Sequence, residues 1–193
     1  MTPSRRINTM KYTSKTGFFT GDSRAGHCYD KHLAKALLPF LQGSVIDIGC
    51  GGGEYVKFFT EQGIEIQGVD GNPHTNSFNS MCRVVDLSDR ISLGCFNQVI
   101  SLEVGEHIPS KSEDNFIWNI ANQGAEELFI SWAIPGQGGI GHVNCRTNTH
   151  VRRVLFKYGY SRNQEVEELL REKATLPWFK NTLMSFRKRK TFL

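Results

Sequence analysis

One segment of the chain reads Val45-Ile46-Asp47-Ile48-Gly49-Cys50-Gly51-Gly52-Gly53, an apolar run with one acid followed by four glycines in five positions. Such an apolar run is typical of a strand buried on both faces of a parallel sheet. The glycines predict a tight turn in which the backbone can approach a ligand closely. Residues 54–59 continue at helical spacing. Together they predict a strand, a glycine turn and a helix, which is the entry to a nucleotide-type site.

The spacing of the glycines separates two kinds of nucleotide site. A dinucleotide fingerprint requires G-x-G-x-x-G, but the third glycine would fall on Glu54 or Val56 in the two available frames. Residues 47–53 follow D-x-G-x-G-x-G instead, with the acid inside the strand. This pattern resembles motif I of the class I S-adenosylmethionine-dependent methyltransferases.

The acids of three later segments support the resemblance. Four further segments have the composition of strands: residues 64–70, 83–88, 96–103 and 128–134. The first three carry an acid at or near their ends, namely Asp70, Asp86 and Glu103. An acid about 20 residues after a glycine turn can accept hydrogen bonds from ribose hydroxyls. Because the carboxyl ends of parallel strands meet at one edge of a sheet, we expect these acids to share one site.

The alternation of strands and helices predicts an α/β fold with a parallel sheet and helices on both faces. The resemblance implies the rest of the topology, a seven-stranded, mostly parallel sheet whose last strand, near residues 182–186, is antiparallel. Asn148 is a possible cap of one of the later helices. Beyond the one after the glycine turn, helices are expected over residues 30–41, from residue 112 between the fourth and fifth strands, and over residues 147–158 and 165–174.

The length of 193 residues suits one domain. We expect a lid formed by residues 1–30, with aromatic side chains such as Tyr12 and Phe19, on a single methyltransferase domain of residues 31–193. No apolar run approaches the ~18 residues of a membrane span, and the first 11 residues lack the apolar core of a signal peptide. Five cysteines without a C-x-x-C pair indicate a reducing compartment, so a cytoplasmic location is expected.

The charge of the chain helps to predict which class of molecule it acts on. The net charge is only +4, and basic residues gather near the two ends of the chain. Enzymes of nucleic acids usually carry a larger and broader basic surface. The balance therefore argues against a nucleic-acid partner and favours a small-molecule or glycan acceptor, although basic ends that bind nucleic acid remain an alternative.

The resemblance implies S-adenosylmethionine as the cofactor, with Asp47 at its ammonium group, Asp70 at the ribose and Asp86 at the adenine amine. An alternative for Asp86 is a local role, in which it caps a turn at Ser88. The full set of cofactor contacts that the resemblance implies is Asp47, Gly49, Cys50, Gly51, Gly53, Asp70, Gly71, Asn72, Asp86, Leu87 and Glu103.

Two loops carry the candidate catalytic residues. Glu103, Glu106 and His107 directly follow the fourth predicted strand, and a glycine-rich loop after the fifth carries His142. A hydroxyl acceptor needs a base if it arrives protonated, so we expect one histidine to take that proton. The alternative for His107 is a ring that supports its loop through local hydrogen bonds, and the alternative for His142 is a gate residue in a mobile loop. The four side chains also suit a divalent ion, but no spacing is diagnostic, and no metal is predicted.

The sequence therefore predicts an S-adenosylmethionine-dependent O-methyltransferase. An alternative is methylation of nitrogen in a nucleobase, nucleic acid or protein side chain. The N-P-P-Y tetrad typical of adenine and glutamine N-methyltransferases is missing, and Glu103-Val104-Gly105-Glu106 stands in its place. A second alternative is a cofactor-binding protein without chemistry, against which the acids at three strand ends argue.

Overall fold

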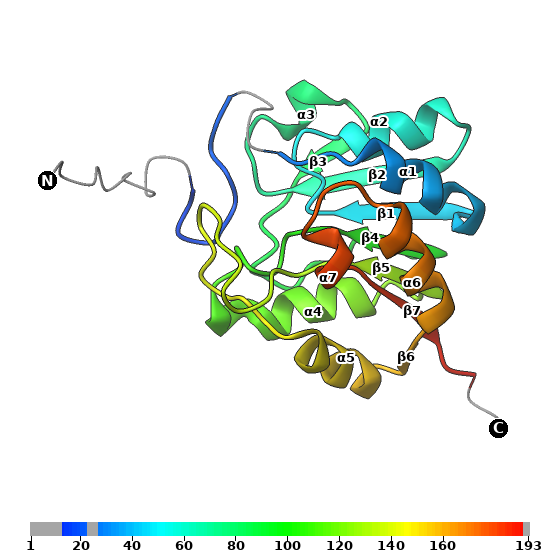
Figure 1. The fold of residues 1–193 in the computed structure, drawn as a ribbon. Helices are drawn as coiled ribbons and strands as arrows, with labels where there is room; N and C mark the ends of the chain where they lie inside the picture. The colour runs from blue at the N-terminus through cyan, green and yellow to red at the C-terminus, as the bar shows by residue number, and fades with distance from the viewer. Residues whose placement is uncertain (1–12, 23–26, 191–193) are drawn as a thin grey trace, which may run out of the picture.

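The computed structural model describes residues 13–22 and 27–190. Part of the predicted lid of residues 1–30 therefore lies outside the described residues. Tyr12 belongs to that part. The described chain forms one seven-stranded sheet in the order β3-β2-β1-β4-β5-β7-β6 (Figure 1). The strands are β1 (Ser44–Ile48), β2 (Glu65–Asp70), β3 (Cys82–Val84), β4 (Gln98–Ser101), β5 (Glu127–Ile130), β6 (Tyr160–Arg162) and β7 (Met184–Lys188).

Strand directions confirm the predicted fold class. Strands β1 to β5 pair in parallel, whereas β7 is antiparallel to both β5 and β6. The last strand starts at Met184, two residues later than Thr182, where the predicted strand began. Thr182 instead ends helix α7 (Phe179–Thr182), where its backbone N–H is already paired with the carbonyl of Trp178.

Helices cover both faces of the sheet (Figure 1). Helices α1, α2, α6 and α7 pack with Val45 on one face, whereas α4 and α5 pack with Ile46 and Ile48 on the other. Side chains alternate between the faces along a strand, so a strand covered on both sides must be apolar throughout. The helices are α1 (Lys31–Leu37), α2 (Glu54–Glu61), α3 (Thr75–Phe78), α4 (Glu113–Ala121), α5 (Asn148–Lys157), α6 (Gln164–Lys173) and α7 (Phe179–Thr182), with short 3₁₀ turns η2 (Leu38–Phe40) and η3 (Ser110–Ser112). None of these helices is long and apolar enough to cross a bilayer.

The cap of α5 differs from the expected one. Thr147, not Asn148, is the N-cap, and its hydroxyl accepts a hydrogen bond from the backbone N–H of His150. Asn148 is the first helical residue, and its side-chain amide donates to the carbonyl of Asn181 at 2.7 Å. Threonine and asparagine both serve as N-caps, so the tertiary contact with Asn181 distinguishes their roles.

Asp30 ties the start of α1 to the segment that follows α6. Its Oδ1 accepts hydrogen bonds from the N–H groups of His32 and Leu33, both at 3.0 Å. Its Oδ2 accepts from the N–H groups of Thr175 at 2.6 Å and Leu176 at 2.8 Å. Burial alone would raise the pKa of this carboxyl, but these hydrogen bonds outweigh burial and lower it. One carboxylate therefore holds together two segments far apart in the sequence.

We expect Asp30→Ala to lower the free energy of unfolding by about 3 kcal/mol, the combined size of a helix cap and of hydrogen bonds to a charged group. Because folding lowers this pKa, the stabilisation is present above the unfolded pKa and is lost as the pH falls below it. Urea unfolding at several pH values measures both effects. The exposed Asp114→Ala variant on α4 is the control, and an equal loss in both would contradict the assigned role of Asp30.

Candidate active site

A cavity of about 310 Å³ opens at the carboxyl ends of the central strands. Its walls come from the loops after β1, β2 and β4, from the glycine-rich loop after β5, and from residues 13–22. Figure 1 shows the last two segments, in yellow and blue, side by side at the same edge of the sheet. The cavity lies where strand order reverses between β1 and β4, which is where open α/β sheets bind ligands.

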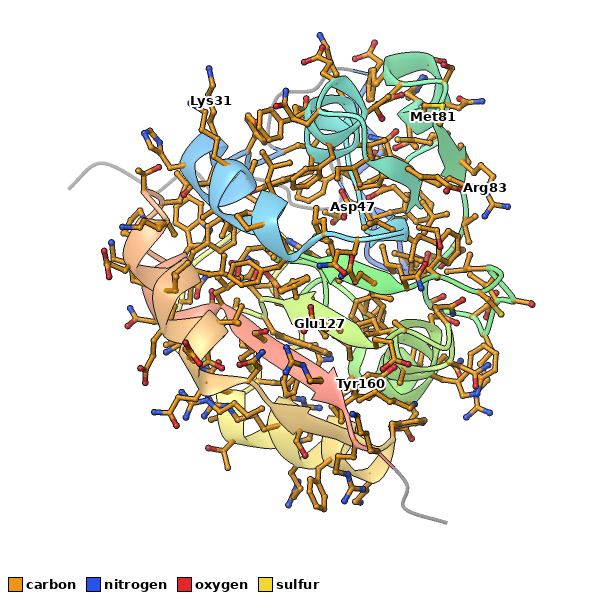
Figure 2. All side chains as sticks on the ribbon, turned by 90° about the vertical axis from the view of Figure 1, so that its right-hand side faces the viewer. Lys31, Asp47, Met81, Arg83, Glu127 and Tyr160 are labelled. Carbon is orange, nitrogen blue, oxygen red and sulfur yellow. The ribbon has the colours of Figure 1, made fainter. Side chains whose placement is uncertain are left out.

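Asp47 lies in the interior beneath this cavity (Figure 2). Its side chain is buried, and its Oδ2 has no hydrogen-bond partner among the described residues. Burial, together with the negative charges of Asp70 and Glu54, raises the pKa of this carboxyl to about 8. A buried acid without a partner is costly, so the site is incomplete without a positively charged or donating group.

The glycine turn follows Asp47 directly. Gly49 has φ +88° and Gly51 has φ +53°, a conformation that residues with a side chain rarely adopt, and both line the cavity with Cys50. Gly53 does not line the cavity. It packs against Asn79 instead, and a Cβ at this position would stand 2.8 Å from the Cβ of Asn79. Gly53 therefore permits packing of the turn, while the other two expose main chain to the cavity.

Asp70 at the end of β2 braces the turn. Its Oδ2 accepts from the N–H of Gly51 at 2.9 Å, and its Oδ1 accepts from the N–H of Asn72 at 2.8 Å. Burial raises the pKa of Asp70, and these two hydrogen bonds oppose the rise. Gly71 lines the cavity, whereas Asn72 is buried behind it, where its amide donates to the carbonyl of Gly21.

Asp86 and Leu87 line the same cavity. The Oδ1 of Asp86 accepts from the N–H of Ser88 at 3.0 Å, which is the local cap considered as the alternative. Its Oδ2 accepts from the hydroxyl of Thr16 at 2.8 Å. Asp86 thus has a local role and also faces the cavity, where an incoming donor would compete with Thr16.

Glu103 begins the second group of cavity residues. It has φ +55°, the one positive value among the described residues other than glycine, a conformation that costs on the order of 1 kcal/mol or more. Its N–H donates to the hydroxyl of Ser131 at 2.8 Å. Its carboxylate accepts from the amide of Gln137 at 2.7 Å and from the hydroxyl of Thr182 at 3.1 Å. Two side chains therefore hold this carboxylate, and Ser131 holds the backbone of the same residue at the end of β4.

Glu106, His107 and His142 meet beside Glu103 in the cavity wall. Glu106 is fully buried, and its pKa is raised well above the usual value by burial and by the charge of Glu103. The two imidazole rings are 5.1 Å apart between centroids. Burial and the neighbouring His142 lower the pKa of His107 to about 4, so this ring is neutral at physiological pH. The structure brings all four predicted catalytic side chains together.

Sequence reasoning missed several residues that line the cavity or hold its side chains. Gln137 and Thr182 hold Glu103, and Thr16 reaches Asp86. Phe19, which was expected among the lid aromatics, packs edge-on against His107 with 5.2 Å between ring centroids. The position of Gln137 in a glycine-rich loop beside the expected site could have identified it as a site residue. No sequence signal predicts the contact of Thr182 with Glu103, because that contact depends on how α7 packs against the sheet.

The cavity suits S-adenosylmethionine at its β1–β2 end. Asp47 offers an unpartnered oxygen for an ammonium group, and Asp70 and Asp86 offer carboxylates at neighbouring positions. The main chain at Gly49 and Gly51 borders the same space. When bound, this cofactor supplies a methyl group on a positively charged sulfur.

A family model described as a methyltransferase domain matches residues 23–124, which is more than half of the chain. The chain belongs to this methyltransferase family. It is an S-adenosylmethionine-dependent class I methyltransferase, with S-adenosylmethionine as its cofactor. No curated protein sequence matches it significantly.

Solved structures agree with this assignment. A TehB-like S-adenosylmethionine-dependent methyltransferase from Corynebacterium glutamicum is 18% identical, with a TM-score of 0.61 over 82% of this chain and 88% of that one. Magnesium protoporphyrin IX methyltransferase from Synechocystis, with bound S-adenosylhomocysteine, is also 18% identical, with a TM-score of 0.63 over 81% and 80%. The 1,6-didemethyltoxoflavin-N1-methyltransferase of Burkholderia thailandensis is 16% identical, with a TM-score of 0.57 over 83% and 78%. At these identities the similarity establishes the shared fold.

We expect binding of S-adenosylhomocysteine at pH 7 to release about one proton, because Asp47 has a pKa near 8 in the free protein and ionises beside the ligand's ammonium. Asp47→Asn should release none and bind about 10- to 100-fold more weakly. Calorimetry in buffers of different ionisation enthalpy measures the proton count. The exposed Asp89→Asn variant is the control, and equal proton release by the wild type and Asp47→Asn would contradict this role.

Proposed function

We propose that this methyltransferase acts on oxygen, transferring the methyl group to a hydroxyl of a small-molecule or saccharide acceptor. The observation that supports this is one continuous cavity with two chemically different ends. Asp47, Asp70 and Asp86 line the end that suits the cofactor, and Glu103, Glu106, His107 and His142 line the other. The second end offers proton acceptors to a weakly acidic nucleophile, which a hydroxyl requires and an already neutral amine does not.

The size of the cavity supports a small acceptor or the tip of a larger one. Its volume of about 310 Å³ lies at the lower end of the ~300–1,000 Å³ typical of small-molecule sites, and the cofactor takes much of it. The remaining space therefore suits a small acceptor or the end of a larger one.

Transfer is an in-line displacement in which the acceptor oxygen attacks the methyl carbon and the carbon–sulfur bond breaks. The chain supplies alignment and a site for the released proton. His142 is the assigned acceptor of that proton, because it lines the cavity and its Nε2 lies 3.9 Å from Oε1 of Glu106. Burial and the neighbouring His142 lower the pKa of His107 to about 4, so the His107 ring is a poor proton acceptor at neutral pH.

Residues 13–22 act in this proposal as the described part of the lid. Phe18 covers Gly71, where an added Cβ would collide with its ring. Phe19 packs against His107, and Gly21 accepts a hydrogen bond from Asn72. The segment thus covers both ends of the cavity, which excludes water from the transfer.

The location proposed for the enzyme is the cytoplasm. All five cysteines fall within the described ranges, and each is a free thiol. Unpaired cysteines are typical of a reducing compartment.

We expect His142→Ala to lower kcat by about 100-fold or more, the usual contribution of a positioned base, while binding of S-adenosylhomocysteine stays within about threefold. Turnover is measured as methyl incorporation from labelled cofactor into separate panels of saccharides, nucleosides, phenols and amines. His32→Ala on the exposed side of α1 is the matched control. Product formed only from amines, or unchanged kcat in both His107→Ala and His142→Ala, would contradict the proposal.

A further inference from the structure

The cavity contains a group of side chains with the composition of a metal site. Glu106, His107 and His142 each offer a ligand atom, and these atoms all lie within 4.8 Å of one another. Glu106 and His107 come from the loop after β4, and His142 comes from the loop after β5. The fold therefore brings together two loops that are far apart in the sequence, since His107 and Gly141 are 34 residues apart.

Each of the two imidazole rings has its Nδ1 near a backbone carbonyl oxygen. Nδ1 of His107 lies 3.3 Å from the carbonyl oxygen of Gly141, and Nδ1 of His142 lies 3.1 Å from that of Gln137. A carbonyl oxygen only accepts hydrogen bonds, so Nδ1 carries the proton in each ring and Nε2 keeps a lone pair. Histidines that bind metals typically donate the other ring N–H to a carbonyl or carboxylate in this way.

Glu106 supplies the second, independent observation. The residue is fully buried, and neither carboxylate oxygen has a hydrogen bond of ordinary geometry to a described residue. The groups near this carboxyl are the backbone N–H groups of Glu106 and Ala133, the Glu103 carboxyl, and His142, whose Nε2 lies 3.9 Å from Oε1. Glu103 places another carboxylate beside it in the same wall. Buried acids are normally paired, hydrogen-bonded or bound to a metal. A cation at this point would satisfy Glu106 and offset the repulsion between the two acids.

We propose that Glu106, His107 and His142 bind a divalent transition-metal ion, and that this ion receives the hydroxyl of the acceptor. This inference deepens the proposed O-methyl transfer and rests on it for the catalytic role. Two imidazoles with one carboxylate suit manganese, iron, cobalt or zinc, whereas magnesium and calcium prefer oxygen ligands throughout. Three ligands from the chain leave further positions open for the acceptor.

The main chain anchors the site. The N–H groups of Val143 and Asn144 donate to the carbonyl oxygen of Glu106 at 2.8 and 2.9 Å, and the indole of Trp132 donates to the carbonyl of Asn144 at 2.7 Å. The loop after β5 is thus fixed to Glu106 just beyond His142. Ligands of one bound ion lie about 3 Å apart, so the side chains must draw together on binding. Glycines at 138, 139 and 141 give the loop that freedom.

With the ion bound, the group that accepts the hydroxyl proton of the acceptor is no longer His142. A hydroxyl that contacts a divalent cation is more acidic, and both imidazoles serve as ligands instead of bases. In the transfer the acceptor's O–H bond breaks and its proton passes to the Glu103 carboxylate. The oxygen–methyl bond forms as the carbon–sulfur bond breaks, leaving S-adenosylhomocysteine. No oxidant or reductant is involved.

The decisive experiment titrates Co²⁺ into the full chain after treatment with a chelator and dialysis. Visible absorption and calorimetry follow binding independently of turnover. We expect one site in the wild type, and affinity at least about 100-fold lower in Glu106→Gln and in His142→Ala. His32→Ala, which changes an exposed histidine on α1, should bind Co²⁺ like the wild type. Binding of S-adenosylhomocysteine, measured on each variant, shows that the cofactor end remains folded.

Turnover separates the metal proposal from the function on which it rests. We expect chelation to abolish methyl transfer, and Co²⁺ or Mn²⁺ to restore it where Mg²⁺ does not. The metal site is overturned if the wild type binds no Co²⁺, or if Glu106→Gln and His142→Ala bind it as the wild type does. Full turnover after chelation would overturn the catalytic role of the ion. Methyl transfer only to amines would instead contradict the O-methyltransferase proposal, whatever the Co²⁺ result.

Discussion

The parallel pairing of β1 with β4 is the constraint on which the site depends. Asp47 on β1 lies beside Ile100 on β4, and the hydroxyl of Ser101 donates to the carbonyl of Ile48 at 2.7 Å. The loops that leave these two strands must therefore begin next to each other. One loop is the glycine turn and the other carries Glu103, Glu106 and His107, so sheet pairing alone brings the cofactor end and the acceptor end into one cavity.

A second constraint acts through conformation at the ends of these strands. Gly49 adopts a positive φ, and an added Cβ there would collide with Val104 of the neighbouring loop. Glu103 adopts a positive φ although it has a side chain. Such strain persists only where surrounding contacts over-determine it, and Ser131, Gln137 and Thr182 supply those contacts. The turn thus needs glycine, while the acid is held in place by its neighbours.

The sequence predicts the sheet better than it predicts the contacts within the site. Strands covered on both faces are mostly apolar, so their positions are visible in the order of residues. The acids that interrupt or end them, Asp47 within β1 and Asp70 at the end of β2, are visible as well. Thr147 could not be distinguished from Asn148 as a cap, because the contact that separates them comes from Asn181. The convergence of His107 and His142 could be anticipated from loops at the same sheet edge. The contact of each Nδ1 with a backbone carbonyl could not, since it depends on carbonyl groups of the loop after β5.

Residues 13–22 contact both halves of the cavity. Thr16 and Phe18 lie against Asp86 and Gly71, while Phe19 lies against His107. Because one ten-residue segment contacts both ends, a displacement that uncovers one end also breaks its contacts at the other. If this segment is the proposed lid, cofactor and acceptor would leave in a single opening step, and the strength of these contacts would set the speed of that step.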